Sequence, residues 1–243
     1  RLHAAFNDVL RDFNVDRDRV YIAGFSNGGT GSLYMAELWP DRFAAVVSLM
    51  GAGQCMEDIQ KSLANLANLP ILFVHGEKDT RVVPSCSQGT YESLNGLHTR
   101  VAPQLRLLPD REHDITLQSD DGLTLSFLKD KVREAFPRRV AFYLSDLNFP
   151  RQYWVEALEK KSRPAEITAE VKKDNRLEIH SSEVKKLRLH LRPEMFPQPG
   201  PVRILWNGKL VFEGPLKDVC PPADAVAGDP KLDLTDDKDF SLP

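Results

Sequence analysis

Two different periodicities divide this chain near residue 137. In the first part, short and mostly apolar runs, such as "FAAVVSLM" and "PILFVHG", alternate with segments of helical spacing. Such runs, separated by helices, are typical of a parallel sheet covered on both faces. Residues 1–137 are therefore predicted to form an α/β unit. Its expected strands span 20–25, 43–50, 70–75 and 104–109, and its expected helices span 1–14, 28–38, 87–98 and 122–136.

Beyond residue 137 the apolar residues recur at every second position. In "KKLRLHLR" leucines alternate with basic residues, and Asn207-Gly208 lies between two further alternating runs, "VRILW" and "KLVFEG". Asn-Gly in that setting is a strong hairpin signal. Residues 138–217 are therefore predicted to form a small antiparallel β-sandwich, an accessory domain. Residues 218–243 are acidic and contain several prolines, which predicts a flexible tail.

Composition narrows the function classes. The chain is 42% hydrophobic and 28% charged, as in ordinary globular proteins, and its net charge of −3 with scattered lysines and arginines indicates no nucleic-acid surface. The apolar runs are far shorter than a bilayer span, so no membrane insertion is expected. The 3 cysteines match no zinc spacing. No metal and no organic cofactor are expected, because no cluster of histidine, cysteine or carboxylate side chains calls for one.

The run "VYIAGFSNGGTGS", residues 20–32, carries the main chemical signal. A phosphate-binding loop would need a lysine after its last glycine, and a dinucleotide site would need G-x-G-x-x-G; neither is present. The pattern G-x-S-x-G does fit, with Gly24, Ser26 and Gly28. After a buried strand and before a helix, it predicts a strained turn that presents a nucleophilic serine, with glycine on both sides because a Cβ there would clash. A plain glycine turn is the alternative.

A nucleophilic serine needs a base and an acid, which follow it in the order acid, then base. Asp79 lies just after the run "PILFVHG", with Glu77 as second candidate and an Asx-turn as the alternative role of Asp79. His113 follows the next strand at the equivalent position. His75 ends a strand before the acid and is interpreted as structural packing at the floor of the site. The catalytic residues are thus predicted to be Ser26, Asp79 and His113.

These residues lie in stretches that resemble the catalytic half of α/β-hydrolases: "DRDRVYIAGFSNGGTGSLYMAELWPDRFAAVVSLMGAG", "LPILFVHGEKDTRVVP" and "REHD". The resemblance covers residues 1 to about 136 and is strongest to bacterial esterases, the branch of polyhydroxybutyrate depolymerases, feruloyl esterases and dienelactone-hydrolase-like proteins. That branch is related to the prolyl oligopeptidase catalytic domain. The resemblance implies acyl transfer by Ser26, His113 and Asp79, with the backbone N–H of Asn27 as an oxyanion donor.

By this resemblance the partner is an ester substrate, small or linked to a polymer such as a polysaccharide. Two other functions stay open: a serine peptidase of the prolyl-oligopeptidase type, and a hydrolase-like binding protein without catalysis. The compartment also stays open, with a secreted or periplasmic location among the options.

The chain departs from the family pattern before the serine. The family has several strands there, and a loop among them supplies the second oxyanion donor; here roughly four of about eight strands are expected. The sequence starts without methionine, inside or just before an amphipathic helix, and is interpreted as a piece of a longer or processed protein. An exposed sheet edge is expected to be covered by the missing N-terminal segment, another chain or a dimer partner.

Two features leave alternatives open. Cys55 and Cys86 both follow strands at the catalytic edge, and they either pair in an oxidising compartment or remain two unrelated buried thiols. Several aromatic residues of the second part form either a carbohydrate-stacking face or sandwich core. They are Tyr153, Trp154, Trp206 and Phe212.

Overall fold

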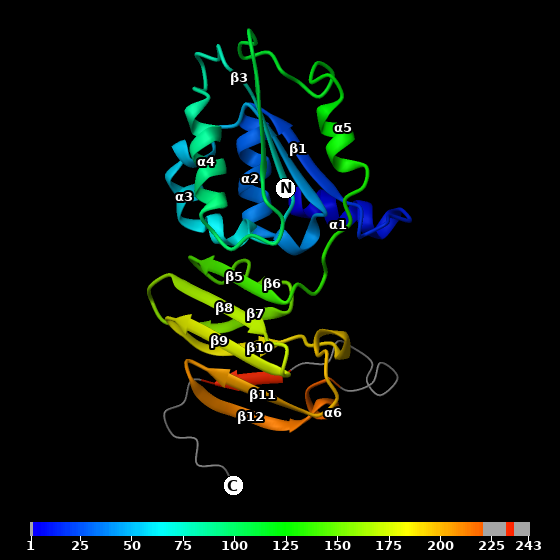
Figure 1. The fold of residues 1–243 in the computed structure, drawn as a ribbon, viewed down its shortest axis with the longest axis vertical. Coiled ribbons are helices and arrows are strands. Elements are labelled where there is room, and N and C mark those ends of the chain that lie inside the picture. The colour runs from blue at the N-terminus through cyan, green and yellow to red at the C-terminus, as the bar shows by residue number, and fades with distance from the viewer. Residues whose placement is uncertain (1, 221–231, 236–243) are drawn as a thin grey trace.

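The computed structural model describes residues 2–220 and 232–235 of this chain (Figure 1). Within these residues, none of the helices combines the length and the apolar character that a bilayer crossing requires. The first part contains α1 (Leu2–Asp12), β1 (Tyr21–Phe25), α2 (Asn27–Leu38), η1 (Pro40–Arg42), β2 (Ala45–Leu49), η2 (Gly53–Cys55), α3 (Glu57–Ser62), η3 (Leu63–Leu66), β3 (Ile71–Gly76), α4 (Ser85–Asn95), β4 (Gln104–Leu108) and α5 (Leu123–Leu128). The second part contains β5 (Arg139–Leu144), β6 (Arg151–Gln152), β7 (Val155–Lys160), β8 (Ala165–Val171), β9 (Arg176–Ser182), β10 (Val184–Leu189), η4 (Pro193–Met195), β11 (Pro201–Trp206), β12 (Lys209–Pro215), α6 (Leu216–Val219) and β13 (Leu232–Thr235).

The first part is built on a parallel sheet with the strand order β1-β2-β3-β4. Every residue of β2 and β3 is buried, because helices cover both faces. Val46 and Phe73 pack with α2, η3 and α4 on one face, whereas Val47 and Val74 pack with α5 on the other. Figure 1 shows α2, α3 and α4 on one side of the sheet and α5 on the opposite side. The prediction of a parallel sheet covered on both faces is confirmed.

The last helix of this part is much shorter than predicted. The expected helix over 122–136 ends at Leu128, and the chain then runs without regular structure. Tertiary contacts take the backbone groups that a longer helix would pair internally. The amide of Arg133 donates to the Asp18 carbonyl, its guanidinium bonds the Asp18 carboxylate and the Asp41 carbonyl, and the Lys131 carbonyl accepts from the Tyr21 hydroxyl. The helical period of 129–136 therefore did not decide its structure.

Strand β1 is an edge strand in the described part of the chain. It pairs with β2 on one side, and its residues are all partly exposed, in contrast to the buried β2 and β3. An open edge offers unpaired backbone groups to another strand. That another segment or chain covers this edge stays a prediction.

The second part consists of two sheets around a common core. Their strand orders are β13-β10-β7-β6 and β12-β11-β9-β8-β5, and residues of both sheets pack into one apolar cluster. Strands β6 and β7 were not predicted from the sequence. Most pairs are antiparallel, but β9 and β11 are parallel, so the prediction of a purely antiparallel unit is wrong at this pair. The chain between them passes through β10, which belongs to the other sheet, and through η4. It then returns to the sheet that contains β9 and runs in the same direction as β9.

The hairpin at Asn207-Gly208 is confirmed. Trp206 pairs with Lys209, and both turn residues have positive φ, 49° for Asn207 and 81° for Gly208. Two positive φ values define the turn that matches the twist of antiparallel strands, and Asn-Gly adopts them at low cost.

The prediction of a flexible tail is wrong for the two segments of it that the structure describes, residues 218–220 and 232–235. Residues 216–219 form α6 and Cys220 is buried, and β13 adds to the edge of β10. Leu234 is buried in the core, and the Asp233 carboxylate binds the Arg188 guanidinium at 2.7 Å. The alternation in "LDLT" thus fits a half-buried strand. The rest of this tail prediction lies outside the described residues.

The aromatic residues of the second part are core. Trp154 is fully buried, and Tyr153 and Trp206 are nearly so, while Phe212 packs partly buried against the same cluster. The Trp154 indole N–H donates to the Pro137 carbonyl at 2.7 Å, which satisfies its polar group inside the protein. The alternative of a carbohydrate-stacking face at these residues is therefore wrong.

Polar side chains of the first part bind the edge of the second part. Asn65 in η3 pairs with both backbone groups of Tyr143 in β5, accepting from its N–H at 2.7 Å and donating to its carbonyl at 3.1 Å. Asn68 donates to the Arg139 carbonyl at 2.9 Å. Since β5 is the outer strand of its sheet, these amides take the place of a neighbouring strand. They tie the two parts together below the parallel sheet (Figure 1).

Candidate active site

Ser26 occupies a sharp turn between β1 and α2. Its φ of 54° and ψ of −118° lie in a region that residues other than glycine rarely adopt. The Ser26 N–H donates to the Leu49 carbonyl of β2 at 2.8 Å, and its carbonyl accepts from the Thr30 N–H in the first turn of α2. Bonds on both sides therefore hold the serine in its strained conformation.

Small residues allow this turn to pack closely. A Cβ on Gly24 would lie 2.2 Å from the Gly28 carbonyl oxygen, and a Cβ on Gly29 would lie 2.7 Å from the Leu49 carbonyl oxygen. A Cβ on Gly28 would meet nothing within 4 Å. The prediction that both neighbours of the serine must be glycine for lack of room is therefore correct for Gly24 and wrong for Gly28. The crowded positions are 24 and 29, because these contact the backbone of the same turn and of β2.

The loops after β3 and β4 meet at Gly76. A Cβ on Gly76 would lie 2.4 Å from the Arg111 carbonyl, and the Lys78 N–H donates to that same carbonyl at 2.9 Å. Ile115, fully buried, anchors the second loop just beyond the histidine. The two loops are thus held side by side at the carboxyl edge of the sheet.

The structure brings Ser26, His113 and Asp79 together at this edge. His113 Nε2 lies 2.8 Å from Ser26 Oγ, and His113 Nδ1 lies 2.7 Å from Asp79 Oδ2. Asp79 has a fully buried side chain, and the His113 side chain is 8% exposed. Because a carboxylate only accepts hydrogen bonds, Nδ1 carries a proton and Nε2 is left to accept from the serine hydroxyl. The Phe25 ring packs against the imidazole, with 5.0 Å between the centroids of the two rings.

The environment of Asp79 keeps it charged. Burial, the largest single influence, raises the pKa of Asp79. The hydrogen bonds from His113 and from the backbone N–H groups of Val82 and Arg81 lower that pKa, and together they outweigh the effect of burial. These amides donate to Oδ1 at 3.0 and 2.9 Å. The pKa of Asp79 therefore lies below its ordinary value, and the carboxylate is ionised at neutral pH. The Asx-turn that was the alternative role of Asp79 is present in these two bonds, and Asp79 also contacts His113.

The other predicted residues lie as follows. Glu77, the second candidate acid, is exposed, and it is Asp79 that contacts His113. Asn27 is the first residue of α2 and is exposed. The first N–H groups of a helix have no acceptor within the helix, so the Asn27 N–H can face a ligand beside Ser26. Its role as an oxyanion donor stays a prediction.

One contact of Asp79 was not predicted from the sequence. His75 is fully buried, and its Nε2 lies 3.2 Å from Asp79 Oδ2. A histidine four residues before the acid, at the carboxyl end of the same strand, was the available signal. Within the described residues, no three histidine, cysteine or carboxylate side chains gather as a metal site would require.

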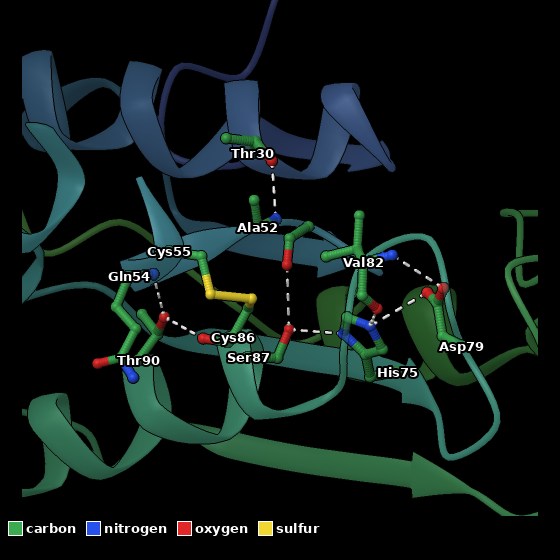
Figure 2. Close-up of a disulfide and its surroundings, with 11 residues drawn as sticks. Thr30, Ala52, Gln54, Cys55, His75, Asp79, Val82, Cys86, Ser87 and Thr90 are labelled. Atoms are coloured by element: carbon green, nitrogen blue, oxygen red, sulfur yellow. Dashed lines mark hydrogen bonds and ion pairs between the residues drawn. A yellow bond between two sulfur atoms is a disulfide. The ribbon is translucent and has the colours of Figure 1, made fainter. Parts of the chain in front are cut away.

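Cys55 and Cys86 form a disulfide, so the first of the two alternatives for them is correct. The bond joins η2, after β2, to the first turn of α4 (Figure 2). Around it the Gln54 N–H donates to the Thr90 hydroxyl at 2.7 Å, and the Ala52 N–H donates to the Thr30 hydroxyl at 2.8 Å. The disulfide thus fastens the loop after β2 to the helix that follows the acid.

Loss of this disulfide is expected to lower the free energy of unfolding by about 3–4 kcal/mol. Its cysteines are 31 residues apart, and a crosslink over that span removes much conformational freedom from the unfolded chain. Urea denaturation of the double variant Cys55→Ala/Cys86→Ala against the unmodified chain measures the difference. The control is Cys220→Ala, which removes a buried thiol and no crosslink and is expected to cost on the order of 1 kcal/mol. Equal losses in the two variants would contradict a stabilising crosslink.

Residues 4–120, just under half of the chain, match the sequence profile of a family described as phospholipase/carboxylesterase. Among solved structures, esterase PE8 is 23% identical with a TM-score of 0.45, over 54% of this chain and 58% of that one. Arabidopsis thaliana SOBER1 is 21% identical with a TM-score of 0.44, over 53% and 60%. An acylaminoacyl peptidase of Pyrococcus horikoshii is 18% identical with a TM-score of 0.46, over 54% and 27%.

The chain thus spans less than two thirds of the length of each of these proteins. The matched region contains the turn at Ser26 together with Asp79 and His113. The first part of this chain is therefore an α/β-hydrolase-like unit with a parallel sheet, similar in sequence to the phospholipase/carboxylesterase family.

Proposed function

We propose that this chain is a serine hydrolase that cleaves carboxylic esters through an acyl-enzyme. One observation carries the proposal: a continuous line of hydrogen bonds joins Ser26 Oγ, on a strained turn, to His113 and on to a buried, charged Asp79. A serine hydroxyl is a poor nucleophile by itself and needs an adjacent base that is oriented by a third group. Few purely structural arrangements require all three parts.

The residues act in the following order. Ser26 Oγ attacks the ester carbonyl while its proton passes to His113 Nε2, and Asp79 holds Nδ1–H and stabilises the imidazolium. The Asn27 N–H, at the N-terminus of α2, donates to the oxyanion that develops. His113 then gives its proton to the leaving alcohol. Water, deprotonated by His113, then attacks the acyl-enzyme, and the bond to Ser26 Oγ breaks as His113 returns the proton to that oxygen, which releases the carboxylic acid and restores Ser26.

The proposed substrates are small or polymer-linked esters, and the second part is proposed as an accessory domain. The similarity of residues 4–120 to carboxylesterases supports the ester class. The finer placement among polyhydroxybutyrate depolymerases, feruloyl esterases and dienelactone-hydrolase-like proteins stays a prediction. The disulfide Cys55–Cys86 favours an oxidising compartment, such as a secreted or periplasmic location.

A fluorophosphonate probe and two chromogenic substrates test this function. The probe is expected to modify Ser26, located by mass spectrometry of the digested chain, and a short-chain nitrophenyl ester is expected to be hydrolysed much faster than a peptide nitroanilide. Faster turnover of the anilide would make the chain a peptidase. Absence of both labelling and turnover would contradict catalysis and favour a hydrolase-like binding protein.

A further inference from the structure

A second histidine lies behind the acid. His75, at the carboxyl end of β3, is fully buried, and its Nε2 lies 2.8 Å from the Val82 carbonyl and 3.2 Å from Asp79 Oδ2. The same Oδ2 accepts from His113 Nδ1 at 2.7 Å. Figure 2 shows the His75 ring between Ser87 on one side and Asp79 on the other.

The hydrogen-bond partners decide where His75 carries its proton. The Val82 carbonyl can only accept, so Nε2 must donate, and this N–H lies beside the Asp79 carboxylate. On the other side of the ring, Ser87 Oγ lies 2.8 Å from Nδ1 and 3.3 Å from the Gly51 carbonyl. The Val82 carbonyl therefore requires a proton on Nε2, whether the Ser87 O–H points to Nδ1 or to the Gly51 carbonyl.

The disulfide between Cys55 and Cys86 lies next to Ser87, the residue that contacts His75 Nδ1. Ser87 directly follows Cys86, and the crosslink to Cys55 keeps the start of α4 against the loop after β2. Asp79 and His113 are the titratable side chains in contact with this cluster, and the remaining described contacts of His75 are the Ser87 hydroxyl and the Val82 carbonyl. His75 is therefore placed to act on the acid, and through it on the base.

We propose that His75 is a positioning residue for the acid: its Nε2–H, which donates to the Val82 carbonyl, lies beside Asp79 Oδ2 and stabilises the negative charge that the acid presents to the base. This inference rests on the proposed function of the same site. The dipole of an N–H group close to a carboxylate stabilises the charge of that carboxylate and weakens its attraction for other partners. In a site closed to water such effects are larger than in solution.

A matched pair of amide substitutions tests the proposal. His75→Gln places an N–H near the position of Nε2, whereas His75→Asn can still accept from Ser87 but ends short of Asp79. In His75→Asn, the acid limb of the pH profile of kcat/KM for a nitrophenyl ester is expected to move up by about 0.5 pH unit. The reason is that the negative charge of Asp79, without the N–H of His75 beside it, stabilises the protonated form of His113 more strongly. KM is expected to stay within about two-fold, since His75 is fully buried behind Asp79. In His75→Gln the acid limb is expected to stay in place.

Nuclear magnetic resonance on the unmodified chain provides a second test, which does not depend on turnover or on the folding of a variant. The His75 ring is expected to carry a proton on Nε2, and the proton between His113 Nδ1 and Asp79 is expected as a separate low-field signal. In His75→Asn that signal is expected to move further downfield.

Three results would overturn the proposal: an Nε2 of His75 without a proton, an acid limb that does not move in His75→Asn, or equal shifts in the Asn and Gln variants. Failure of the proposed function is recognised separately, by the absence of probe labelling at Ser26. In that case the ring-nitrogen measurement still decides whether His75 donates beside Asp79.

Discussion

Ser26→Ala is expected to lower kcat for ester hydrolysis by about 10⁴- to 10⁶-fold. The substitution removes the one oxygen that His113 Nε2 contacts at 2.8 Å and leaves the rest of the arrangement in place. Alanine keeps the Cβ, so the strained φ of 54° and the amide bond to the Leu49 carbonyl are retained. The loss should therefore be chemical and not structural. Steady-state hydrolysis of a short-chain nitrophenyl ester measures it, with loss of fluorophosphonate labelling as an independent readout.

The matched control for this variant is Ser32→Ala, in the same helix. The Ser32 hydroxyl donates to the Gly28 carbonyl within α2, away from the base. Its loss is expected to cost less than about 1 kcal/mol of stability and to leave turnover nearly unchanged. Residual turnover of Ser26→Ala close to that of the unmodified chain would show that another group performs the hydrolysis.

Asp79→Asn is expected to lower kcat by about 10⁴-fold while KM stays nearly constant. The amides of Arg81 and Val82 both donate to Oδ1, so the oxygen of an asparagine would turn toward them. Its NH₂ group would then occupy the position of Oδ2 and face His113 Nδ1. The imidazole could bond that group only by carrying its proton on Nε2, and it could no longer accept the proton of Ser26.

Glu77→Gln is the control for this second variant. Glu77 is exposed and was the other candidate acid from the sequence. Its substitution is expected to leave the rate nearly unchanged, and urea denaturation of both variants separates catalytic loss from unfolding. A large loss in Glu77→Gln together with a small loss in Asp79→Asn would exchange the two assignments.

Much of this protein could be predicted because its signals are local. Mostly apolar runs separated by helical segments indicate a covered parallel sheet, and β2 and β3 are buried along their whole length. Asn207-Gly208 indicates a hairpin because its backbone preferences match the required turn. The positions of Asp79 and His113 follow from the same logic, since loops after neighbouring parallel strands meet at one edge of the sheet.

Other features depend on contacts between residues far apart in the chain. The segment 129–136 has helical spacing, but Arg133 and Lys131 bond to Asp18 and Tyr21, more than a hundred residues away. The parallel pairing of β9 with β11 likewise follows from how the second part closes around its core. Local patterns carry no information about such partners.

At the candidate site, the turn at Ser26 and the loop positions of Asp79 and His113 could be predicted from short sequence patterns, because a strained turn and a strand edge demand particular residues at short range. Three other features could be seen only once the chain was folded: Gly28 has room for a side chain, Cys55 pairs with Cys86, and His75 lies against Asp79. Each of these depends on the distance between elements that are brought together by packing, and such distances are set by the whole core and not by the residues nearby in the chain.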